Sequence, residues 1–220
     1  MRDDIGGGSI GPSGDRGLTS ARHFDPEPDS SLRAPRSALR MPAEWEPHAA
    51  TWLAWPHHEP DWPGKLGPIP WVYAEIVRAL HRFEPVEVLC HSEAVREGAR
   101  EVLRSHGVLA APDRPRDGAH PVRLHVVPND RVWVRDSGPT GVLREDGSVV
   151  WANWAFNAWA KYDNYTLDAR MGEAFARISG VPRVEPPRPD RDARLVLEGG
   201  GIETNGQGLL LVTEEWLLSD

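Results

Sequence analysis

The sequence contains a single cysteine, Cys90, among its 220 residues. One cysteine excludes an intrachain disulfide and also excludes zinc-finger sites, which need several thiolates. Acidic residues outnumber basic ones, the formal net charge is −8 and the pI is near 5.6, so we expect no nucleic-acid partner. The mean hydropathy is −0.49 and no apolar run is long enough for a transmembrane helix. No apolar core of a signal peptide is present either, so we expect a cytoplasmic protein without membrane contact.

Residues 1–40 lack apolar periodicity and consist largely of Gly, Ser, Pro, Asp and Arg. Such a segment cannot bury enough surface to offset its chain entropy, so we expect 1–40 to be a disordered extension. Organised sequence begins at Met41. We therefore expect one domain over 41–220.

Tryptophan is the unusual component of the composition. The ten tryptophans gather mainly in residues 45–71 and 133–159. Indole rings pack in cores and also stack on cations, so each is either structural or part of a cation site.

Apolar runs alternate with helical patterns in the first part of the domain, which indicates an α/β fold. Ser92 is placed to cap a helix that Gly107 ends. The expected order is a strand (51–55), a long loop (57–70), a helix (71–83), a strand (86–90), a helix (93–106) and a strand (123–127).

Two similar units follow from residue 132. The first is expected to hold an apolar strand (132–134), a hairpin (141–143 and 149–154), a polar-aromatic loop (156–165) and a helix (167–178). The second holds, after a linker (186–192), a strand (195–197), a turn (205–206) and a strand (209–212). Repeats of this kind need neighbours to cover their faces. The last unit ends where its helix should form, so we expect the chain to be a fragment.

An acid followed by a small-residue turn occurs once in each of these units. Trp133 and Asp136 precede the turn Ser137-Gly138-Pro139, and Glu198 precedes three glycines about 60 residues later. We interpret Asp136 and Glu198 as opposite sides of one guanidinium pocket, because carboxylates hold a planar cation through paired N–H bonds. The alternatives are that Asp136 only caps a turn and that Glu198 is a solvated acid at a strand end.

His57 and His58 invite a metal interpretation. An open catalytic site still needs about three protein ligands, and no further ligand has suitable spacing. We expect neither a metal ion nor a cofactor.

A series of ordered motifs runs from Met41 to the last residue. In order they read M-P-A-E-W-E-P-H (41–48), W-L-A-W-P (52–56), D-W-P-G-K (61–65), P-W-V-Y-A-E-I (70–76), N-D-R-V-W-V-R-D-S-G-P (129–139), F-N-A-W-A-K-Y-D-N-Y (156–165) and L-E-G-G-G-I-E-T-N-G-Q-G (197–208). Through these motifs the chain resembles the agmatine deiminase family, including its bacterial peptidyl-arginine deiminase-like relatives.

The resemblance implies a pentein-type α/β propeller, in which five ββαβ-like units surround a substrate funnel. Residues 41–220 would be its N-terminal part, about two and a half units. It also implies a C–N hydrolase that converts agmatine to N-carbamoylputrescine and ammonia, a step of putrescine and polyamine biosynthesis. In this family a cysteine thiolate attacks the guanidinium carbon, and water resolves the amidino-cysteine intermediate.

Matched by motif, the resemblance makes Asp136 a guanidinium-binding aspartate and Glu198 the proton-handling glutamate, with Trp133 as a wall of the funnel. The family's nucleophilic cysteine lies in a C-terminal Gly-rich motif and its histidine in a G-H-x-D-like segment, and neither motif occurs here. Cys90 ends an apolar strand, where cysteines are usually inert packing. We therefore expect this chain alone to be inactive.

Several alternatives stay open. The chain is either part of a working deiminase, or an inactive guanidine-binding module, or a truncation that associates through uncovered faces. Agmatine, arginine and peptidyl-arginine are not distinguished as substrates. The far amine of the substrate has no assigned partner, although Asp163 and the tryptophans are candidates. A homo-oligomer is plausible from the family alone.

Overall fold

A computed structural model describes residues 39–110, 114–115, 118–159, 162–190, 192–214 and 216. The expectation of disorder for 1–40 falls outside these residues except at Leu39 and Arg40. Those two residues form a strand, β1, that pairs with β7 (Thr140–Arg144), whereas the sequence placed them in the extension.

The described chain alternates strands and short helices, which confirms the α/β class. Its helices are α1 (Ile69–Leu80), α2 (Glu93–Ser105), α3 (Val134–Ser137) and α4 (Met171–Ser179), with 3-10 turns η2 (Glu59–Asp61), η3 (Asp168–Arg170) and η4 (Gly199–Gly201). The remaining strands are β2 (Thr51–Ala54), β3 (Val86–Cys90), β4 (Leu109–Ala110), β5 (Arg114–Pro115), β6 (Val122–Val126), β8 (Val149–Ala152), β9 (Arg183–Val184), β10 (Ile202–Thr204) and β11 (Leu210–Val212).

A three-stranded parallel sheet, β2-β3-β6, forms the first part of the fold. All five residues of the central strand β3 are buried. A strand covered on both faces needs apolar residues at nearly every position, which the V-E-V-L-C sequence supplies apart from Glu87. Glu87 is buried because Arg123 and His125 of β6 pair with its carboxylate.

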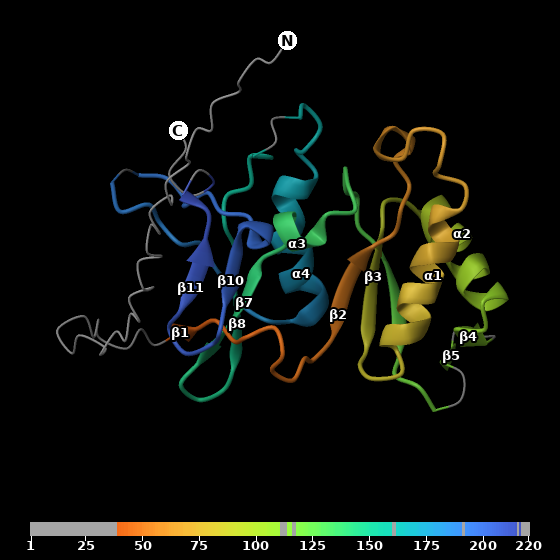
Figure 1. The fold of residues 1–220 in the computed structure, drawn as a ribbon, viewed down its shortest axis with the longest axis horizontal. Helices are drawn as coiled ribbons and strands as arrows, with labels where there is room; N and C mark the ends of the chain where they lie inside the picture. The colour runs from red at the N-terminus through yellow and green to blue at the C-terminus, as the bar shows by residue number, and fades with distance from the viewer. Residues whose placement is uncertain are drawn as a thin grey trace, which may run out of the picture. The chain divides into compact units, whose positions relative to one another are not determined.

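The two faces of β3 pack against different helices (Figure 1). Val86, Val88 and Cys90 point to a core shared with α1 and α2. Leu89 points to a second core shared with α3 and α4. In this second core Trp52 of β2 stacks on Phe175 of α4 with ring centroids 4.1 Å apart. The segment that carries the predicted acid at 136 is thereby held on a rigid layer.

The ends of the helices follow the expected signals. The Ser92 side chain accepts a hydrogen bond from the Val95 N–H and caps α2. Gly180 ends α4 in the left-handed conformation, with φ 70°, which a glycine adopts without steric cost. The helix expected over 71–83 begins two residues earlier and ends three residues earlier.

A second sheet, β1-β7-β8-β9, holds the expected hairpin of β7 and β8. Val142, Val150 and Ala152 form its small core. The last two strands, β10 and β11, form the expected hairpin around Asn205-Gly206. Leucines 209–211 of this hairpin are exposed.

Two expected strands are not strands in the structure. Residues 132–134 lead into the one-turn helix α3, because Asp168 accepts the backbone N–H bonds of Asp130 and Arg131 that a sheet would use. Residues 195–197 make only an isolated bridge, in which Val196 faces Ala155. Asp136 therefore lies within a helical turn and not at a strand end.

No helix of the described residues is long and apolar enough to cross a membrane.

Leu89→Ala tests the second core. Because Leu89 is fully buried between β3 and the α3–α4 layer, its truncation leaves a cavity. The free energy of unfolding should fall by about 2–5 kcal/mol in a urea titration. Phe83→Ala is the control, since its ring is 78% exposed and its loss should change stability by about 0.5 kcal/mol at most. Equal losses for the two variants would contradict the assignment.

Candidate functional site

Asp136 lies half-buried in α3. Burial raises the pKa of its carboxyl group above the usual value, although the neighbouring Arg135 cation and a hydrogen bond from the Gly200 N–H act in the opposite direction. The carboxylate is therefore partly desolvated, and a protein N–H group already binds it.

Glu198 lies half-buried immediately before η4. Its Oε1 accepts a hydrogen bond from the Trp159 backbone N–H at 2.9 Å. Burial raises the pKa of Glu198, the Trp159 bond lowers it, and the negative charge of Asp136 raises it further. The two acids thus lie within electrostatic reach of each other, as the sequence interpretation requires.

The Trp159 N–H reaches Glu198 through an unusual backbone turn. Ala158, the residue before it, has a φ of 52° and is fully buried. A left-handed conformation at a residue with a Cβ atom costs energy, so the surrounding structure must enforce it. Here the turn at Ala158 directs the Trp159 N–H to the Glu198 carboxylate, whose burial would otherwise be costly.

Two glycines bring the acid-bearing segments into contact. A Cβ atom on Gly199 would lie 2.5 Å from the Arg135 carbonyl oxygen, and one on Gly200 would lie 2.0 Å from the Asp136 Oδ1. Because the Arg135 carbonyl belongs to the backbone, only glycine fits at position 199, whereas a side chain at position 200 would force the Asp136 carboxylate to move. The L-E-G-G-G sequence is therefore required by close backbone packing against α3, and this explains why Asp136 and Glu198 converge.

Arg135 strengthens the same contact. Its Nε donates to the Gly199 carbonyl oxygen at 2.9 Å, and a terminal nitrogen donates to the Ile202 carbonyl oxygen at 3.4 Å. The other terminal nitrogen pairs with Glu44. One side chain thereby joins α3, the η4 segment and the M-P-A-E-W-E-P-H segment.

Trp133 is 41% exposed and precedes α3 directly. Its ring meets the edge of Tyr162, with centroids 5.3 Å apart. Burial raises the pKa of Tyr162, and the charges of Glu198 and Asp136 also raise it. The aromatic pair therefore adjoins the two acids, although sequence reasoning assigned no role to Tyr162.

Asp130 and Asp168 fasten the acid-bearing segment to the start of α4. Asp168 is 2% exposed and accepts the N–H groups of Asp130 and Arg131 at 2.8 and 3.2 Å. In return the Asp130 carboxylate accepts the Leu167 N–H at 2.8 Å. Burial raises the pKa of Asp168 to about 6, and the nearby Asp130 charge contributes.

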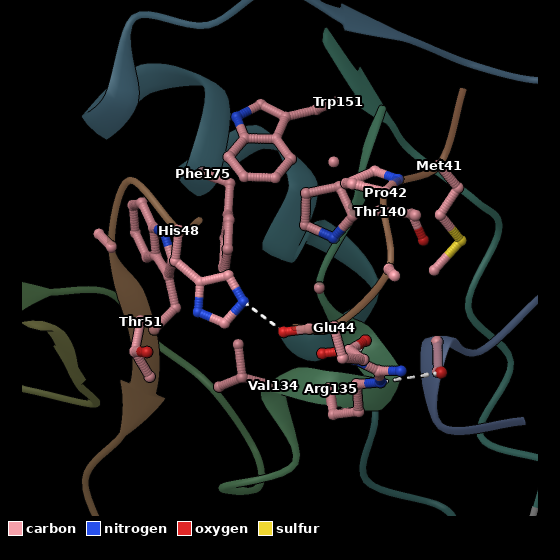
Figure 2. Close-up of a pocket in the computed structure, with 17 residues that line it drawn as sticks. Met41, Pro42, Glu44, His48, Thr51, Val134, Arg135, Thr140, Trp151 and Phe175 are labelled. Atoms are coloured by element: carbon pink, nitrogen blue, oxygen red, sulfur yellow. Dashed lines mark hydrogen bonds and ion pairs between the residues drawn. The ribbon is translucent and has the colours of Figure 1, made fainter. Parts of the chain in front are cut away.

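A cavity of about 360 Å³ adjoins α3 and includes Val134, Arg135 and Gly199 in its lining, but neither of the two acids. Figure 2 shows Trp151 and Phe175 at one end, with Glu44 and Arg135 toward the other. His48 Nε2 donates to the Glu44 carbonyl oxygen, 2.8 Å away. This cavity is therefore distinct from the predicted guanidinium pocket.

The remaining candidates have no catalytic arrangement. Cys90 is fully buried and burial raises the pKa of its thiol to about 12, which agrees with the expected packing role. His57 stacks on His91 at 4.5 Å, and burial lowers the pKa of His57. Within the described part of the chain no three His, Cys, Asp or Glu side chains are grouped to hold a metal ion.

Comparison with known proteins gives the family. Residues 40–220 match the family model described as Porphyromonas-type peptidyl-arginine deiminase. The chain belongs to this family. The resemblance to agmatine deiminases found in the motifs is confirmed by the curated relatives.

The agmatine deiminase of Pseudomonas aeruginosa (strain LESB58) is 37% identical over 194 residues, covering 87% of this chain and 47% of the relative. That of Stutzerimonas stutzeri (strain A1501) is 36% identical over 181 residues, covering 81% of this chain and 44% of the relative. The chain thus spans about half the length of the curated relatives it matches.

A solved structure of the agmatine deiminase of Enterococcus faecalis superimposes with a TM-score of 0.67 at 27% identity. The match covers 83% of this chain and 46% of that chain. The mixed α/β fold is therefore shared with an agmatine deiminase.

Sequence reasoning identified Asp136, Glu198 and Trp133, and the structure places them on segments that touch. Their roles stay predictions. It missed Arg131, Tyr162 and the glycine contact, whose signals were present in the same motifs. The signal for Tyr162 was its place in the polar-aromatic loop (156–165), and the signal for Arg131 was its place in the motif that carries Asp136.

Asp168→Asn tests the fastening of the site. The folded-state pKa of Asp168 is raised to about 6, above the value of about 3.9 in an unfolded chain. The folded state therefore binds this proton more tightly, and stability is lost as the pH rises from about 4 to about 6. The Asp168→Asn variant has no carboxyl group at this position, so it does not lose this pH-dependent stability.

Thermal unfolding between pH 4 and pH 7 should consequently show a wild-type protein that loses stability relative to Asp168→Asn over this window. Asp163→Asn, an exposed position in the same region, is the control and should follow the wild-type curve. Parallel curves for Asp168→Asn and wild type would contradict the raised pKa.

Proposed function

We propose that this chain supplies the guanidinium-binding carboxylates of an agmatine deiminase, which hydrolyses agmatine to N-carbamoylputrescine and ammonia. The observation that carries the proposal is the convergence of Asp136 and Glu198, two half-buried acids on contacting segments beside an exposed indole. The agmatine deiminase relatives support the choice of substrate.

Asp136 has the properties of a guanidinium ligand. Its carboxylate is partly desolvated and close to a second negative charge, which makes the ionised pair costly without a cation. A guanidinium ion would supply the missing charge and donate paired N–H bonds in one plane. In this proposal Asp136 binds the substrate and holds it for attack.

Glu198 has the properties of a proton carrier. Departure of ammonia needs a proton donor, and an acid with a raised pKa holds its proton closer to neutral pH than an ordinary glutamate does. Burial and the Asp136 charge raise the pKa of Glu198, while the Trp159 N–H fixes one carboxylate oxygen. The second oxygen has no partner in the described residues and would face the reacting nitrogen.

Trp133 would form a wall of the pocket. An indole face attracts a planar cation, with a stabilisation of about 0.5–2 kcal/mol. Because Trp133 is exposed and held by Tyr162, it offers such a surface next to Asp136.

The nucleophile of the proposed reaction is a cysteine thiolate, and Cys90 does not serve. A thiol whose pKa is about 12 and whose side chain is fully buried provides almost no thiolate at neutral pH. We therefore propose that the cysteine and histidine of the family reaction lie outside these 220 residues, and that the described units belong to a five-unit pentein propeller.

The chain on its own should bind agmatine without releasing ammonia, and calorimetry together with an ammonia assay checks both points. Steady ammonia release would contradict the proposal that these residues bind the guanidinium group but do not contain the nucleophilic cysteine. Absence of agmatine binding would contradict the proposal that these residues form the guanidinium site.

Asp136→Ala tests the pocket in a form of the protein extended by the cysteine and histidine segments. Loss of the principal guanidinium ligand should lower agmatine turnover at least 100-fold, about 2.7 kcal/mol of transition-state stabilisation. Asp192→Ala removes an exposed carboxylate elsewhere and should keep full activity. Unchanged turnover in Asp136→Ala would rule out the assignment.

A further inference from the structure

We infer that Arg131 is a positioning residue. It binds the segments of Asp61 and Asn164 to the segment that carries Asp136, and it thereby holds Trp133 and Tyr162 in place as the aromatic wall of the guanidinium pocket. This inference rests on the proposed function. It concerns a side chain that does not itself touch the substrate.

The Arg131 guanidinium lies over both rings of the aromatic pair. Its central carbon is 4.1 Å from the centroid of Tyr162 and 5.3 Å from that of Trp133. The two rings meet edge to face. A cation so placed fixes the angle between the rings, because each ring is attracted to it through its face.

Polar contacts hold the edge of the same guanidinium. One terminal nitrogen pairs with Asp61 of η2, and the other donates to the Asn164 Oδ1 at 2.8 Å. The side chains of Arg131 and Asp61 are only 14% and 5% exposed. A largely buried ion pair is costly to desolvate, so it is a poor source of stability but a precise spacer.

Arg131 thus connects three parts of the chain that are far apart in sequence. Asp61 belongs to the long Pro- and Gly-rich loop, and Asn164 to the polar-aromatic motif. The backbone of Arg131 is itself fixed, since Asp168 accepts its N–H at 3.2 Å and Asn129 Nδ2 donates to its carbonyl oxygen at 2.9 Å. The backbone from which the Arg131 side chain extends is therefore held by hydrogen bonds on both its N–H and its carbonyl group.

A neighbouring carboxylate compensates the positive charge of Arg131. Asp61 pairs with it directly through Oδ1, and the His58 Nδ1 lies 3.2 Å from the same oxygen. Arg131 Nε and Asp61 Oδ2 are buried without a hydrogen-bond partner. A group that leaves buried polar atoms unpaired is not optimised for stability, which favours a role in placing the aromatic rings.

The position of the wall matters because Tyr162 adjoins the acids. The charges of Glu198 and Asp136 both act on its hydroxyl group. Trp133 lies two residues after Arg131 and three before Asp136. A displaced ring pair would therefore change the width of the space next to the carboxylates.

Arg131→Met and Arg131→Lys, each made in the 220-residue chain, test the inference. Methionine keeps the unbranched stem of the side chain and removes the planar cation, and lysine keeps the charge but cannot contact Asp61 and Asn164 while stacking. The dissociation constant for agmatine, measured by calorimetry, should rise at least tenfold in both. Amide hydrogen exchange should become faster in residues 59–61 and 162–165.

Arg123→Met is the matched control. Arg123 also pairs with a buried carboxylate, that of Glu87, but in the parallel sheet. Its loss should lower stability without changing agmatine affinity or exchange in the two segments. Tyr162→Ala should weaken agmatine binding as Arg131→Met does, and the double variant should be no weaker than either one, because both act through the same wall.

The outcomes separate the two proposals. If the wild-type chain binds agmatine and Arg131→Met binds it equally well, the inference is wrong and the proposed function stands. If the wild-type chain does not bind agmatine, the proposed function fails. In that case amide hydrogen exchange decides the positioning role. Exchange in residues 59–61 and 162–165 that is the same in Arg131→Met and wild type overturns the role, and faster exchange in Arg131→Met supports it.

Discussion

The close contact between Gly199-Gly200 and the helical turn of Arg135 and Asp136 is the constraint on which the site depends. A Cβ atom on Gly199 would overlap the Arg135 carbonyl oxygen of the backbone, and one on Gly200 would displace the Asp136 carboxylate. This contact joins two segments about 60 residues apart in sequence. Arg135 reinforces it through bonds to two carbonyl oxygens of the glycine segment. Convergence of the acids follows from backbone packing and not from attraction between their side chains.

The electrostatic consequence is a pair of acids that repel each other in a partly dry environment. Burial and mutual repulsion raise the pKa of Glu198, and burial raises that of Asp136. In the proposed site this arrangement is costly without a bound cation and would become favourable once a guanidinium ion lay between the carboxylates. A local loss of stability that apolar cores elsewhere in the fold offset is typical of a binding site.

Much of the fold was predictable because local signals agree with it. Strand β3, the Ser92 cap and the β7–β8 hairpin follow from apolar runs and turn residues that tertiary contacts do not override. The segment 132–134 was misread as a strand, because its apolar sequence does not reveal that Asp168 takes the neighbouring amide groups. Arg131 was missed for a similar reason: a long-range ion pair with Asp61 leaves no periodic pattern. Asp136 and Glu198 were proposed from the sequence because each precedes a turn of small residues.

The most direct test of the central claim is the pKa of Glu198, followed by carboxyl-carbon NMR in the wild-type chain and in Asp136→Asn. Removal of the Asp136 charge should lower the pKa of Glu198, since that charge raises it in the wild-type protein. Addition of agmatine to the wild-type chain should also lower it. A Glu198 pKa that is the same in both proteins and indifferent to agmatine would contradict the account of one shared guanidinium site.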